Sequence, residues 1–180
     1  MAGLLEGFLE QFTTGGAPET NAADFHDRFV SQDENDRDFD NQVYHEAATE
    51  HLQQMPDHEF QTAARTAVTQ VDPQQRQDLL GGLLGALGSA AARGGLGGMT
   101  NSSGGDAIGQ ITRMLGIGTT DPRQMSGDDA AKLMDYARKE QPNALRQTVA
   151  EKPWLVKAMG NPIVMGALTM AATRLLRSRR

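Results

Sequence analysis

An unbroken helical spacing of apolar residues between positions 60 and 71 constrains the fold of this chain more than any other feature. Its members recur at i, i+3, i+4, i+7, i+8 and i+11, which is one face of an α-helix: Phe60, Ala63, Ala64, Ala67, Val68 and Val71. Pro56 and Pro73 flank this segment where the first residue of a new helix would stand. No stretch alternates β-branched and polar residues as a strand would. We therefore predict an all-α protein, a compact bundle of about seven to nine helices without a β-sheet.

Helix boundaries and composition refine this prediction. Asp72 is predicted to cap the helix that follows it, and Ser126 with Asp129 has the spacing of a capping box. The segment from Ala17 to Asp40 is acidic and irregular, so we expect a loop there. Only 5% of the residues are aromatic. We therefore expect a core built mostly from Leu, Ala, Met and Val.

The stretch "LLGGLLGALG", residues 79–88, places leucines on one arc of a helix and glycines on the opposite side. Each interior glycine costs roughly 0.8–1 kcal/mol relative to alanine, so this helix needs a buried leucine face. Three interpretations follow: a core helix whose glycine ridge admits a close neighbour, a lipid-facing or self-associating helix, or an unstructured stretch. The candidate packing residues are Leu79, Leu83, Leu84, Leu87, Gly81, Gly85 and Gly88.

Charge and glycine content suggest how the chain is organised. Residues 88–105 are rich in glycine and serine and are predicted to be a linker between an acidic half, 1–87, and a basic half, 106–180. Residues 1–90 hold 16 acidic and four basic side chains, whereas residues 91–180 hold seven and 13. These halves attract each other, within one combined domain, between chains, or toward an anionic surface.

The last helix is predicted to be apolar on every side from Ile163 to Ala172, and arginines follow it. They are Arg174, Arg177, Arg179 and Arg180. The fifteen residues from Pro162 to Leu176 reach only about 22 Å, which is short of a bilayer core of about 30 Å. Two interpretations stay open: a buried central helix whose arginines complement the helix dipole, or a membrane-surface anchor whose arginines meet anionic headgroups.

Few residues of the sequence are candidates for catalysis or for binding a metal or cofactor. The chain has no cysteine, which excludes disulfides and thiolate catalysis. His45, Glu46, Glu50 and His51 share one predicted helix and are the candidate metal ligands, although the Glu-x-x-His spacing of di-iron proteins is absent. Phosphate-binding loops and a G-x-S-x-G nucleophile motif are also absent. We predict no catalytic residue and no cofactor, and nucleic-acid binding is not expected because stacking aromatics are scarce.

The opening "LLEGFLEQF", the leucine–glycine run, the glycine-rich middle and the late helical segment together resemble bacterial YidB-like proteins of uncharacterised function. The resemblance implies a small bacterial helical protein and assigns no catalytic residue. Glu6 and Glu10 interrupt the first apolar run, so no secretory signal is predicted and we expect a cytoplasmic protein, or one peripheral to the inner face of the membrane.

The predicted function is non-enzymatic, acting through a protein partner or self-association, with an anionic membrane surface as a further partner. The alternative is a helical carboxylate and histidine metal-binding protein or enzyme.

Overall fold

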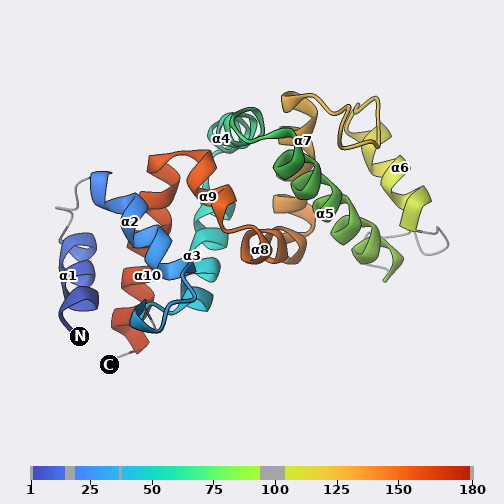
Figure 1. Cartoon of the computed structure of the whole chain (residues 1–180). Helices are drawn as coiled ribbons and strands as arrows, with labels where there is room; N and C mark the ends of the chain where they lie inside the picture. The colour runs from blue at the N-terminus through green and yellow to red at the C-terminus, as the bar shows by residue number, and fades with distance from the viewer. Residues whose placement is uncertain (1, 15–18, 37, 94–103, 179–180) are drawn as a thin grey trace. The chain divides into compact units, whose positions relative to one another are not determined.

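A computed structural model describes residues 2–14, 19–36, 38–93 and 104–178 of the chain (Figure 1). Within these ranges the regular structure consists of ten α-helices and one short 3-10 helix, and no strand occurs. The all-α prediction is therefore confirmed, with one helix more than the upper estimate of nine.

The chain forms two compact units. Unit 1 comprises residues 1–54 and 153–180, and unit 2 comprises residues 55–152. The helices of unit 1 are α1 (Ala2–Thr13), α2 (Glu19–Val30), the 3-10 helix η1 (Glu34–Asp36), α3 (Asn41–Gln54), α9 (Trp154–Met159) and α10 (Asn161–Ser178). The helices of unit 2 are α4 (Asp57–Gln70), α5 (Pro73–Ala92), α6 (Gly104–Met114), α7 (Gly127–Glu140) and α8 (Pro142–Glu151).

Helix α10 is the centre of unit 1 and packs against α1, α2, α3 and α9. Its buried residues are Ile163, Val164, Ala167, Leu168, Ala171, Ala172 and Leu175. Because this apolar surface is covered inside unit 1, the structure supports the buried-helix interpretation of the C-terminal segment. None of the helices in the described part of the chain combines the length and apolar character needed to cross a bilayer.

Five of the six phenylalanines gather in the core of unit 1. They are Phe8, Phe12, Phe25, Phe29 and Phe39. The ring centroid of Phe8 lies 4.9–6.0 Å from those of the other four. Aromatic residues are rare in the sequence, yet this core concentrates them. Most of the other buried apolar residues of unit 1 are Leu, Ala, Val or Met, so the expected core composition holds there, and the phenylalanine cluster adds to it.

Helix α2 lies within the acidic segment where a loop is predicted, so that prediction is wrong for residues 19–30. Ala22, His26 and Phe29 are buried, and their i, i+4, i+7 spacing gives the helix one inward face. Asp24 and Asp27 are exposed and lie between these positions in the sequence. The high acidic content hides a short amphipathic pattern.

The leucines of α5 form the core side of unit 2, as predicted. Leu79, Leu80, Leu83, Leu84 and Leu87 are all buried, and Gly88 is buried with them. The glycine ridge differs from the prediction. Gly81, Gly82 and Gly85 are exposed. A Cβ at Gly81 would lie 4.0 Å from Pro122, and a Cβ at Gly82 or Gly85 would meet no described atom within 4 Å. The role of Gly81 and Gly85 as a close-packing ridge is thus corrected, because the buried face of this helix consists of the leucine arc with Gly88 and Ala91.

Both predicted caps are confirmed, and the predicted linker is shortened. The Asp72 side chain accepts a hydrogen bond from the backbone N–H of Gln75 (2.9 Å), and Ser126 and Asp129 form a capping box. Helix α5 continues to Ala92 and α6 starts at Gly104, so both ends of the predicted linker, residues 88–105, are helical. Residues 94–103 lie outside the described residues. The boundaries between the two units lie at positions 54/55 and 152/153, so neither boundary falls in the predicted linker.

Candidate functional site

The two candidate metal-binding carboxylates on α3 meet an arginine of α10. Glu46 lies 2.8 Å from a guanidinium nitrogen of Arg174, and Glu50 binds the other terminal nitrogen of the same group. The hydrogen bond to Glu50 raises the pKa of Arg174 above its usual value. This guanidinium takes the place that a metal cation would need, so both carboxylates belong to an ion pair.

The two candidate histidines on α3, His45 and His51, do not take part in that ion pair. Burial lowers the pKa of both His45 and His51, so each favours its neutral form. The His51 ring lies directly against Gly166 of α10. In the described residues no group of three or more His, Asp or Glu side chains is placed to hold a metal ion. The four predicted ligands are therefore not brought together as one site.

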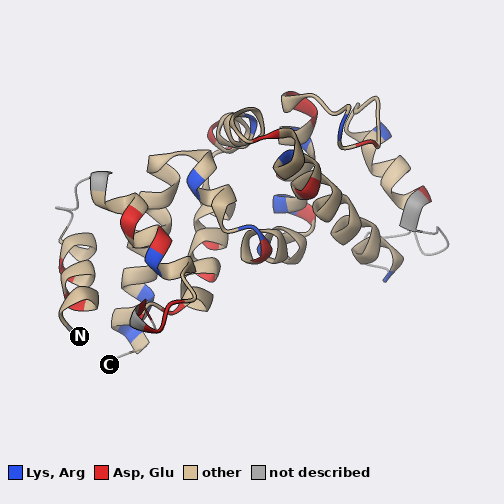
Figure 2. Ribbon diagram, viewed as in Figure 1, with Lys and Arg blue, Asp and Glu red and all other residues tan. Residues whose placement is uncertain are grey.

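The four C-terminal arginines are not all in the same environment. Arg174 is tied to α3 inside unit 1, whereas Arg177 is exposed. Arg179 and Arg180 lie outside the described residues. Figure 2 shows α10 mostly uncharged, with its basic residues near its C-terminal end. Residues of the acidic and basic halves thus form an ion pair within unit 1, which agrees with the first of the three alternatives, attraction within one chain.

We expect Gly166→Ala to lower the free energy of unfolding of unit 1 by about 1–3 kcal/mol, because a Cβ there would overlap the His51 ring and force it to move. Urea denaturation followed by the fluorescence of Trp154, the single tryptophan of the chain and a residue of unit 1, measures this loss.

Gly85→Ala is the matched control, because it makes the same change in the interior of α5 where the added Cβ meets no described atom. It is expected to stabilise the protein by up to about 1 kcal/mol through helix propensity. Equal effects of the two substitutions would contradict the assignment of Gly166 as a contact position.

A buried histidine that the sequence analysis missed ties α2 to the start of α9. His26 is 1% exposed; its Nε2 lies 3.0 Å from the carbonyl oxygen of Pro153, and its Nδ1 lies 3.2 Å from a carboxylate oxygen of Asp27. Burial acts to raise the pKa of Asp27, but hydrogen bonds from Lys157 and His26 outweigh it and hold that pKa below its usual value. Both partners of the His26 ring, the carbonyl oxygen of Pro153 and the carboxylate of Asp27, are hydrogen-bond acceptors.

A second buried polar cluster, around Arg138 of α7, was also missed. Arg138 donates to Asp135 (2.6 Å), to Asp57 (2.6 Å) and to the carbonyl oxygen of Met55 (2.6 Å). Its guanidinium carbon lies 4.5 Å from the ring centroid of Phe60, a cation–π contact. Because Arg138 and Asp135 are both buried, this cluster fastens the start of α4 to α7 inside unit 2.

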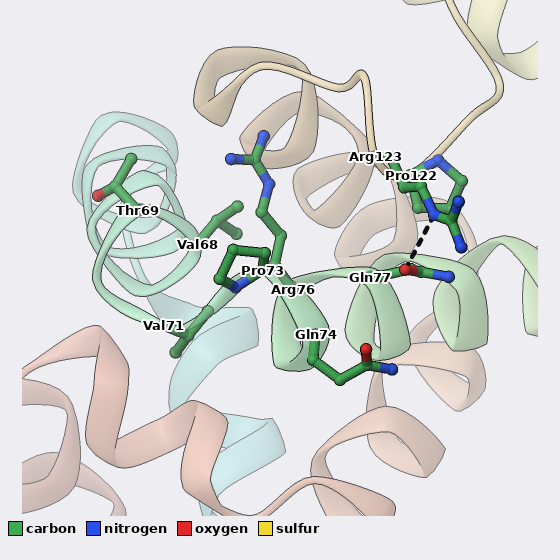
Figure 3. Close-up of a pocket in the computed structure, with 9 residues that line it drawn as sticks. All are labelled: Val68, Thr69, Val71, Pro73, Gln74, Arg76, Gln77, Pro122 and Arg123. Atoms are coloured by element: carbon green, nitrogen blue, oxygen red, sulfur yellow. Dashed lines mark hydrogen bonds between the residues drawn. The ribbon is translucent and has the colours of Figure 1, made fainter.

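A surface groove of unit 2, shown in Figure 3, is a candidate binding site. It has a volume of about 600 Å³ and is lined by the end of α4, the start of α5 and the turn before α7. The lining residues are Val68, Thr69, Val71, Pro73, Gln74, Arg76, Gln77, Pro122 and Arg123. None of these nine residues is acidic, although the chain carries 23 acidic side chains and a net charge of −6.

Two arginines supply most of the hydrogen-bond donors of the groove. Arg76 rises from α5 toward the space between α4 and the turn that holds Pro122 (Figure 3), and it donates to the carbonyl oxygen of Met125. Its Nε is buried and has no hydrogen-bond partner among the described residues. Arg123 donates from its Nε to Gln77 (3.0 Å), the dashed contact in Figure 3. Guanidinium groups beside valine and proline walls suit a ligand that carries both carboxylates and apolar groups.

The groove does not depend on the N-terminus of α5 as an anion site. Asp72 already caps that terminus by accepting a hydrogen bond from Gln75. One repeated dipeptide in the sequence marks two of the segments that line the groove. Asp72-Pro73 and Asp121-Pro122 are the same dipeptide, and both prolines line the groove. The spacing of 49 residues between the two prolines hides this relation, because only the fold brings them together.

Comparison with known proteins gives no match: no family model, no curated protein and no solved structure is similar to this chain. The resemblance to YidB-like proteins stays a prediction, and so do the bacterial origin and the cytoplasmic location.

Proposed function

We propose that this protein is a non-enzymatic binding protein that holds an acidic segment of a partner protein in the groove between α4 and α5. The observation that carries the proposal is the lining of that groove: two arginines, two glutamines and a threonine beside valine and proline, with no acidic residue among the nine.

Carboxylates bind guanidinium groups with good geometry, because the planar fork of arginine matches their two oxygens. The valine and proline side chains of the groove supply the apolar contact that a peptide needs beyond its charges. The rest of the chain carries a negative net charge, which repels an acidic ligand from most other surfaces. These two features together favour the groove over non-specific binding.

The proposal is tested by fluorescence anisotropy with a labelled octaglutamate peptide and with octaglutamine of the same length. We expect the full-length protein to bind octaglutamate more tightly, because octaglutamine offers no carboxylate to the arginines. Raising the ionic strength from about 0.01 M to about 1 M shortens the Debye length from about 30 Å to about 3 Å and is expected to weaken this binding.

Arg123→Glu is expected to weaken octaglutamate binding at least about tenfold, or about 1.4 kcal/mol, because it places a carboxylate in the groove. Arg113→Glu makes the same charge change at an exposed position of α6 outside the groove and serves as the control. Equal losses in the two variants would reject the groove as the binding site.

A separate variant tests the alternative that the protein binds an anionic membrane surface. Arg177 is exposed near the end of α10, so Arg177→Glu removes a described charge that anionic headgroups would meet. Co-sedimentation with anionic vesicles that is lost in Arg177→Glu and kept in Arg123→Glu would favour a membrane surface over an acidic protein segment. If the groove binds an acidic protein segment, neither Arg177→Glu nor Arg123→Glu is expected to change vesicle binding.

A further inference from the structure

We infer that the acidic segment held in the groove is residues 31–40 of a second copy of this chain, an inference that rests on the proposed function of the groove. The sequence of this segment is "SQDENDRDFD", with five acidic residues in ten, more than any stretch of equal length elsewhere in the chain. It belongs to unit 1, whereas the groove belongs to unit 2.

Contacts of its own residues hold the acidic segment in place. Asp36 forms an ion pair with Arg28 of α2 (3.1 Å). Phe39 is buried in the phenylalanine core, 5.1 Å from the ring of Phe29. Asp40 caps α3 by accepting a hydrogen bond from the backbone N–H of Gln42 (2.9 Å). A segment fixed in this way loses little conformational freedom when it binds.

The segment also presents acidic side chains to solvent. Asp33, Glu34 and Asp38 are all exposed. Figure 2 shows the loop after α2 as a concentration of acidic residues in unit 1. Apart from η1, the described part of this segment has no helix, so its side chains project from a short irregular backbone. An irregular, acidic and pre-ordered segment is complementary to a groove lined by arginine, valine and proline.

This pairing is heterologous, because the acidic segment and the groove are different surfaces of the chain. Each copy that offers its segment to a neighbour still has its own groove open for another copy. Such contacts build rings or open chains of subunits. The ion-pair character of the contact makes this assembly sensitive to salt.

The test uses the full-length protein in sedimentation velocity at low ionic strength. The wild type is expected to sediment faster as its concentration rises. Arg123→Glu keeps the acidic segment but loses the groove, and Asp33→Lys with Asp38→Lys keeps the groove but loses the segment. Each of these two variants alone is expected to be monomeric.

An equimolar mixture of the two variants gives the decisive result. One variant still offers its acidic segment and the other still offers its groove, so the mixture is expected to form dimers of two chains and nothing larger. Glu6→Lys with Glu10→Lys makes the same charge change on exposed positions of α1 and is expected to assemble like the wild type. Far-UV circular dichroism verifies that every variant is folded.

Two outcomes would overturn the inference: a wild type that stays monomeric at every concentration, or assembly that Arg123→Glu leaves unchanged. The octaglutamate assay separates this failure from that of the proposed function. A monomeric wild type that still binds octaglutamate would keep the groove as a binding site and assign it to a different protein, whereas absence of octaglutamate binding would reject the groove itself.

Discussion

Phe8→Ala is expected to lower the free energy of unfolding of unit 1 by about 3–5 kcal/mol, the range found when a buried phenylalanine is truncated. Phe8 is 0% exposed, and its ring packs against four other phenylalanines that come from α1, α2 and the segment before α3. The substitution leaves a cavity where these elements meet. Because core packing is dense, the neighbouring rings can fill that cavity only in part.

The fluorescence of Trp154 during urea denaturation follows this loss, since Trp154 belongs to unit 1. Leu4→Ala is the control on the same helix, because Leu4 is 52% exposed and its truncation is expected to change stability by less than about 0.5 kcal/mol. A Phe8→Ala protein as stable as Leu4→Ala would mean that the five rings do not form the core of unit 1.

The sequence predicts well those elements whose information is local. The apolar spacing of α4, the leucine arc of α5 and the capping residues Asp72 and Ser126 all lie within one helix or its boundary. A helix can therefore be inferred from its own residues. Helix α2 was missed because its exposed acidic residues outweigh a pattern of only a few buried positions.

Contacts between distant residues explain what the sequence analysis could not predict. Glu46 and Glu50 lie on one helical face, a pattern that suits a metal ion or an arginine equally well. The choice depends on Arg174, more than 120 residues later in the chain. The groove has the same origin, because Pro73 and Pro122 meet only in the folded unit 2. A single sequence contains these partners but not their pairing.

Removing Arg138 from the buried polar cluster of unit 2 is the second substitution with a large expected loss of stability. Arg138→Ala is expected to lower the free energy of unfolding of unit 2 by about 3–5 kcal/mol, because it removes the buried guanidinium and leaves the half-exposed Lys139 to compensate the buried carboxylate of Asp135. Asp135 is 7% exposed and would keep its contacts with Lys139 (3.1 Å) and Gln61 (3.2 Å), and the carbonyl oxygen of Met55 would lose the guanidinium donor. Hydrogen exchange of the amides of α4 and α7 measures the loss within unit 2.

Two further variants distinguish the buried ion pair from simple loss of a charge. Lys132→Ala removes an exposed cation from the same helix and is expected to change stability by less than about 0.5 kcal/mol. Arg138→Met with Asp135→Leu replaces both buried charges by apolar side chains, so it is expected to recover most of the stability that Arg138→Ala loses. If this double variant is instead as unstable as Arg138→Ala, the destabilisation comes from the lost contacts of Arg138 with Met55 and Phe60, and the loss of the guanidinium beside the Asp135 carboxylate is not its cause.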